Sequence, residues 1–154
     1  NKTGKGEYIQ VCDQSLSLLI PNKNYIFLRR FSSKDDSSRL IATPYFSDSV
    51  DADLIGVENH LNYIYRPSGH LDRNEILGFA ALLNSTLFDT YFRTFNGNIN
   101  VSATELREMP LPQLETIKQI GNAIIIKNNF SQSTVDEVIE QFFKLEKEFS
   151  SIYE

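Results

Sequence analysis

The first 70 residues contain short segments rich in aromatic and β-branched side chains, separated by polar turns, which is a pattern typical of β-strands. Tyr25 to Phe31 and Arg39 to Phe46 flank the polar run from Ser32 to Ser38. This arrangement predicts a β-hairpin, because serine and aspartate favour turns. Asp53 to Val57 and Leu61 to Arg66 predict a second pair of strands around a turn at residues 58–60.

After residue 70 the apolar positions recur every three or four residues, which predicts a helix. Asp72 and Glu75 have the spacing of an N-terminal capping box, and Asn96 with Gly97 favours a helix end. We therefore expect one helix over this span, packed across the sheet because its apolar face is broad. The apolar positions at this spacing are Ile76, Phe79, Ala80, Leu83, Leu87 and Tyr91.

Two further helices are predicted, after an irregular segment at residues 97–112. The first spans about Gln113 to Ile126, and the second spans about Thr134 to Ile152. The last helix has a heptad seam that packs either on its own domain or on another helix, from the parent protein or from a second copy. The seam residues are Val135, Val138, Phe142, Leu145, Phe149 and Ile152.

The predicted fold class is α+β, with mostly antiparallel N-terminal strands packed on a long helix and followed by C-terminal helices. We expect one domain at residues 1–127, with residues 128–154 as a helical appendage of it. The chain has 154 residues and 41% hydrophobic composition, which suits one such domain. It has no apolar run that would span a membrane, no secretory segment, and one cysteine, Cys12, so we expect a cytoplasmic protein. The first residue, Asn1, suggests a fragment of a longer protein.

The charge pattern gives two opposite indications about partners. The formal net charge is −5, which disfavours nucleic acid and favours the alternative of a protein–protein interaction module without DNA contact. The stretch from Lys23 to Arg39 is nevertheless locally basic, with five cations against Asp35 and Asp36. A DNA-binding function therefore depends on this segment.

Catalytic and metal-binding patterns are absent from the sequence. His60, His70 and Cys12 do not have metal-ligand spacing, and no complete phosphate-binding loop occurs. No serine lies in a Gly-x-Ser-x-Gly motif. A hydrolase assembled from dispersed residues is a third and weaker alternative, and we expect the chain itself to be non-catalytic and free of cofactors.

The strongest candidate site is the polar end of the predicted hairpin. Cations and hydroxyls there suit phosphate contacts, and guanidinium groups also read guanine edges. The alternative is a solvated hairpin whose charge is balanced by neighbouring aspartates. Strand geometry places Arg29 and Arg30 on opposite faces, so at most one of them reaches a groove. The candidate residues are Arg29, Arg30, Ser32, Ser33, Lys34 and Arg39.

A second group of candidates surrounds the turn before the strand at residues 61–66. Asn59, His60 and Asn62 either contact bases or build a tight turn. Asn62 and Arg66 lie on the polar face of the strand, and both are included as candidate DNA contacts.

Four ordered segments resemble the C-terminal specificity region of adenine-specific restriction–modification methyltransferases of the TaqI-like type. The helix with Leu83-Asn84-Ser85, the Gly-containing loop after it and the run Leu106-Arg107-x-x-Pro110-x-Pro112 are also similar to type I specificity subunits. The resemblance covers about residues 20–125. The segments are Leu28-Arg29-Arg30-Phe31-Ser32-Ser33-Lys34, Glu58-Asn59-His60-Leu61-Asn62-Tyr63-Ile64, Leu82-Leu83-Asn84-Ser85-Thr86-Leu87 and Met109-Pro110-Leu111-Pro112.

The resemblance implies a target-recognition domain that docks on double-stranded DNA. It also implies an N-terminal catalytic domain of the same polypeptide, which would bind S-adenosylmethionine and the flipped adenine. This chain has no donor-binding motif and no Asn-Pro-Pro-Tyr motif, so methyl transfer is not carried over to it.

Overall fold

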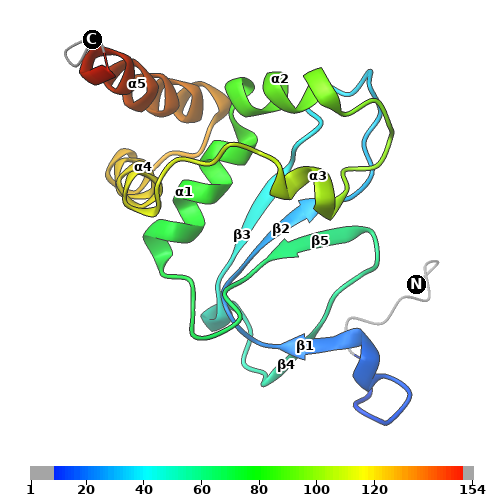
Figure 1. Ribbon diagram of the computed structural model, residues 1–154. Coiled ribbons are helices and arrows are strands. Elements are labelled where there is room, and N and C mark those ends of the chain that lie inside the picture. Colours follow the sequence, from blue (N-terminus) through cyan, green and yellow to red (C-terminus); the bar gives the residue numbers. More distant parts are fainter. Residues whose placement is uncertain (1–8, 151–154) are drawn as a thin grey trace.

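The structure, a computed structural model, describes the backbone of residues 9–150 and the side chains of residues 9–144. A sheet and a two-stranded ribbon lie on one side of the molecule and helices on the other (Figure 1), which confirms the α+β fold. The strands are β1 (Leu19–Pro21), β2 (Tyr25–Arg29), β3 (Ala42–Tyr45), β4 (Leu54–Gly56) and β5 (Leu61–Ile64). The helices are α1 (Arg73–Asn84), α2 (Thr86–Phe95), α3 (Ala103–Arg107), α4 (Leu114–Lys127) and α5 (Gln132–Ser150), with short 3₁₀ turns at Leu16–Leu18 and Ser47–Ser49.

The three-stranded sheet has the order β3-β2-β5, and all of its pairs are antiparallel. The predicted hairpin is confirmed, with Tyr25 opposite Tyr45 and Leu28 opposite Ala42. The predicted pairing of the next two strands is wrong, because β4 pairs with β1 while β5 pairs with the free edge of β2. Strand pairing depends on long-range burial and edge availability, which neighbouring residues do not encode.

Helix α1 covers the face of the sheet that carries Ile26 and Leu28, both fully buried. The capping box is confirmed, since the Asp72 carboxylate accepts from the Glu75 amide at 2.8 Å and Glu75 accepts in return from the Asp72 amide. The prediction of a single long helix is wrong, because Ser85 has an extended backbone and ends α1. Its hydroxyl caps α2 by accepting from the Phe88 amide at 3.2 Å, so the local capping preference of serine divides the span.

Helices α1 and α4 cross at a backbone contact that only glycines permit. A Cβ placed on Gly78 would lie 1.9 Å from the carbonyl oxygen of Ile117, and one on Gly121 would lie 1.9 Å from that of Asn74. The contact brings Ile117, Ile120 and Ile124 of α4 into the core. Helix α4 matches its prediction and ends at Asn128, which has a left-handed backbone with φ 46°.

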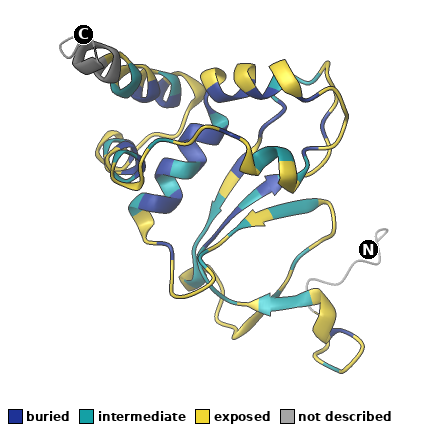
Figure 2. Ribbon diagram, in the orientation of Figure 1, coloured by how far each residue is buried: buried dark blue, intermediate teal, exposed yellow. Residues whose placement is uncertain are grey.

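The remaining segments differ in part from expectation. Residues 97–112 are not wholly irregular, because Ser102 and Glu105 form a second capping box that starts α3. Val135 and Val138 of α5 lie in the common core, so the first part of this helix packs on its own domain (Figure 2). The side chains of Leu145 and Phe149, and all of Ile152, lie outside the described residues. No helix in the described part is long and apolar enough to cross a bilayer.

We predict that Gly78→Ala lowers the free energy of unfolding by about 3 kcal/mol or more, because the added methyl collides with the α4 backbone rather than with a side chain that can move. Urea denaturation followed by circular dichroism measures this change. Gly97→Ala is the matched control, since nothing lies within 4 Å of the position that its added methyl would take. Equal midpoints for the two variants would contradict a tight crossing.

Candidate nucleic-acid interface

Three loops far apart in sequence meet at the end of β2: the β2–β3 loop (residues 30–41), the β4–β5 loop (57–60) and the α2–α3 loop (96–102). The Arg30 amide donates to the His60 carbonyl at 2.9 Å, and the Val101 amide donates to the Arg30 carbonyl at 2.7 Å. The Ser32 amide donates to the Ile99 carbonyl at 2.9 Å. These bonds join the loops into one surface, called here the three-loop surface.

Helix α2 holds the β2–β3 loop in place through two charged side chains. Arg93 donates to the carbonyls of Lys34 and Asp36, at 2.8 and 2.7 Å. Asp89 pairs with Arg93 at 2.7 Å and accepts from the backbone amides of Arg39 and Leu40, at 2.6 and 2.8 Å. The loop is therefore hydrogen-bonded along its length rather than free in solvent.

The ionised form of Asp89 is the form that this arrangement needs. Burial alone would raise the pKa of Asp89, but donation from Arg93 and from the amides of Leu40 and Arg39 outweighs it and holds the pKa below its usual value. The carboxylate is thus charged at neutral pH and able to accept all of these bonds.

Arg39 and Ser32 lie inside the molecule, so the expectation that they line a DNA-binding surface is corrected by their position. The Arg39 side chain is 1% exposed, and its Nε donates to the Ser32 hydroxyl at 2.8 Å. Its Nη2 donates to the Asn96 side-chain oxygen at 2.7 Å and to the Asn98 carbonyl. Arg39 joins the β2–β3 and α2–α3 loops, because a buried guanidinium is tolerated only where its donors are satisfied.

The exposed candidates on the β2–β3 loop are Arg30, Ser33 and Lys34. Arg30 lies beside the Phe31 ring, 5.7 Å from its centroid, and donates to the Asn59 carbonyl at 3.3 Å. Arg29 differs, because it is half-buried and pairs with Asp36 at 2.6 Å. Of the two neighbouring arginines, Arg30 is the more exposed.

The β4–β5 loop contributes Asn59 and His60, both exposed. The His60 ring packs edge-on against Phe31, with centroids 5.5 Å apart, and its Nδ1 lies 2.9 Å from Glu58. Asn62 is half-buried and donates to the Val101 carbonyl at 2.7 Å, which ties β5 to the α2–α3 loop. Asn59 and His60 therefore face solvent, whereas the side-chain amide of Asn62 is used in a hydrogen bond within the protein.

Arg66 is not part of the three-loop surface. The register of β5 on β2 places Leu61 opposite Arg29 and Ile64 opposite Ile26, so Arg66 lies toward the other end of the sheet. There its guanidinium donates to the buried Glu75 at 2.8 Å, at the start of α1. Its position indicates a role in the helix cap.

The α2–α3 loop also contributes to this surface, although none of its residues is among the predicted DNA contacts. Asn98, Ile99 and Asn100 are exposed and lie beside the β2–β3 loop, because Phe31 and Asn100 form a β-bridge. The side-chain amide of Asn96 is buried and bonds to Arg39, to the Asn100 carbonyl and to Glu105, which holds the loop in shape. The density of asparagines around Gly97 is the one sequence signal for this loop.

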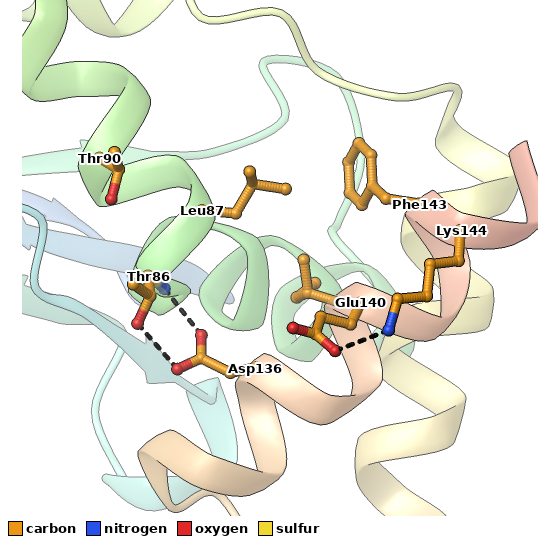
Figure 3. A pocket seen from close by; sticks show the side chains of 8 residues that line it. Thr86, Leu87, Thr90, Asp136, Glu140, Phe143 and Lys144 are labelled. Carbon is orange, nitrogen blue, oxygen red and sulfur yellow. Dashed lines mark hydrogen bonds and ion pairs between the residues drawn. The ribbon is translucent and has the colours of Figure 1, made fainter. Parts of the chain in front are cut away.

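The hollow between α2 and α5 is lined by threonines, two carboxylates, a lysine and apolar side chains (Figure 3). Asp136 accepts from the Thr86 amide and hydroxyl at 2.7 and 2.8 Å, and Glu140 pairs with Lys144 at 3.1 Å. The described part of its lining includes no cysteine or histidine. Within residues 9–144, no group of three or more His, Cys, Asp or Glu side chains could hold a metal ion.

We predict that Asp89→Asn lowers the free energy of unfolding at pH 7 by about 2 kcal/mol, because it weakens charge-assisted bonds to Arg93 and to the loop amides. The native pKa of Asp89 is depressed, so its contribution is present above the unfolded pKa of about 4 and is lost as pH falls through the native pKa. Thermal melts between pH 7 and 3 should show the two proteins converging. A constant difference across that range would contradict this assignment. Asp35→Asn, at an exposed carboxylate of the same loop, is the control.

Comparisons with known proteins place the chain beside methyltransferases. No family model and no solved structure matches it. Type II methyltransferase M.PstI of Providencia stuartii is 34% identical over 144 residues, which are 94% of this chain and 28% of that protein. Type II methyltransferase M.BsuBI of Bacillus subtilis is 36% identical over 124 residues, which are 80% of this chain and 25% of that protein. The homologues of the chain are thus type II methyltransferases, and the chain spans about a quarter of the length of these curated relatives.

Proposed function

We propose that the chain is the target-recognition part of a restriction–modification, adenine-specific DNA methyltransferase, and that it contacts double-stranded DNA through the three-loop surface. The observation that carries this proposal is the convergence of three loops into one ordered surface with exposed cations and amides. The chain is similar to about a quarter of the length of two type II methyltransferases, which supports its assignment as one part of such an enzyme with a specialised role.

The exposed side chains of this surface suit both kinds of DNA contact. Arg30 and Lys34 have the charge to anchor phosphates, and Ser33 has a hydroxyl beside them. Asn59, Asn98 and Asn100 present amides, which pair with adenine in the major groove when both of their polar atoms are used. The cations on one loop would then supply affinity for the DNA backbone, and the amides on the other two loops would read the base sequence.

The network beneath the surface favours binding by lowering its entropic cost. A loop that must be ordered on binding loses affinity, whereas one held in advance does not. Arg93, Asp89 and Arg39 hold the β2–β3 loop in the free protein, through bonds that include those to Lys34, Asp36 and Ser32. We therefore assign Arg39 and Ser32 to positioning rather than to direct contact.

The remaining steps of methylation belong to the rest of the enzyme in this proposal. S-adenosylmethionine and the target adenine would be bound outside this chain, by a catalytic domain of the same polypeptide. Because the chain has a net charge of −5, its own DNA affinity should be weak and strongly dependent on salt. The basic surface needed for tight binding would come from the catalytic domain.

We predict that Arg30→Ala and Lys34→Ala each reduce binding of the chain to duplex DNA. Removal of one phosphate contact makes the negative slope of log affinity against log salt shallower by about 0.9. Fluorescence anisotropy with a labelled mixed-sequence duplex, at several low salt concentrations, measures both quantities. Lys144→Ala on α5 is the matched control, because it removes an exposed lysine that belongs to none of the three loops and pairs with Glu140 at 3.1 Å.

Unchanged affinity and slope in both variants would exclude the three-loop surface as the DNA contact. Complete absence of binding by the unaltered chain at low salt would instead favour the interaction-module alternative, which the acidic net charge supports.

A further inference from the structure

The β1–β4 ribbon lies outside the hydrophobic core of the described residues. It has three residue pairs, and no side chain of either strand is buried. Two-stranded ribbons of this length are marginal in water unless another surface covers them. The ribbon and the segment before it nevertheless expose several apolar side chains: Ile9, Val11, Leu16, Leu18 and Leu54.

The base of this ribbon is firmly anchored, although its strands are not packed. The Asn22 side chain donates to the carbonyls of Ser47, Val50 and Ala52, at 3.0, 3.0 and 2.8 Å. The Tyr25 hydroxyl donates to the Pro21 carbonyl at 2.7 Å, which ties β1 to the sheet. The ribbon is thus held in one direction, below the sheet and away from the helices (Figure 1).

The acidic charge of the ribbon segments does not match a phosphate backbone as the occupant. Residues 9–22 and 46–57 contain no lysine or arginine. Their charged residues are Asp13, Asp48, Asp51 and Asp53, all exposed. Exposed apolar side chains beside carboxylates fit a protein surface that is apolar with a basic rim. The cations proposed to face DNA lie instead on the β2–β3 loop.

We propose that the β1–β4 ribbon is the docking arm by which this chain packs on the remainder of the methyltransferase. This inference rests on the proposed function. The matched region is only 28% and 25% of the two relatives, so most of such an enzyme lies outside it and can supply the covering surface. A catalytic domain that also carries basic DNA-contacting groups would complement the aspartates. The arm then fixes the three-loop surface relative to the catalytic centre.

The test is hydrogen–deuterium exchange on the full-length protein that carries this chain and on the chain alone, both without DNA. We expect the amides of β1 and β4 to exchange about tenfold more slowly, or slower still, in the full-length protein. The double variant Leu16→Asp with Leu18→Asp should remove this protection, while the melting temperature of the chain alone stays unchanged because both side chains are exposed. Ile126→Asp, at a side chain of α4 that is 76% exposed, should preserve the protection.

Equal exchange of the ribbon in the two proteins would overturn the proposal. A dimer of the chain alone, detected by light scattering and abolished by the double variant, would also overturn it, because a second copy would then be the occupant. The exchange experiment contains no DNA, whereas the proposed function is tested by DNA binding of the chain. Failure of one therefore leaves the other measurable.

Discussion

The buried guanidinium of Arg39 is the interaction around which the candidate interface is built. It lies between the β2–β3 loop and the α2–α3 loop, and it uses oxygens of Ser32, Asn96 and Asn98 as acceptors. A cation removed from water is costly unless its donors are bonded. The two loops must therefore close around it, and the Phe92 ring, whose centroid lies 5.9 Å from the guanidinium carbon, covers it from the helix side.

Asp89 and Arg93 extend this constraint to the rest of the β2–β3 loop. The Asp89 carboxylate accepts from two backbone amides at the end of the loop, and the Arg93 guanidinium that is paired with it donates to two carbonyls earlier in the loop. Helix α2 presents both side chains one turn apart, so Ser85, which starts α2, also sets the loop position. The helix break that the sequence did not indicate is thus one reason that the loop is ordered.

The exposed cations of the three-loop surface and the exposed aspartates of the ribbon lie in different segments of a chain whose net charge is negative. Four exposed aspartates lie in and around the ribbon, while Arg30 and Lys34 remain exposed on the three-loop surface. The net charge affects solubility and the strength of non-specific binding, whereas the place of contact depends on the local field. The same acidic total therefore accommodates both a surface proposed to face DNA and an arm proposed to face protein.

Local sequence patterns were sufficient to predict the β2–β3 hairpin, the Asp72 capping box, and the helices near residues 114–127 and 132–150. It also located the polar segment that became part of the candidate site. The folded structure was needed to show that Arg39 is internal while Arg30 is exposed, that Arg66 binds Glu75, and that Asn100 lies beside Phe31. The physical reason is that strand pairing and the burial of an ion depend on partners far away along the chain, as in the bond between Arg39 and Asn96 at a separation of 57 residues.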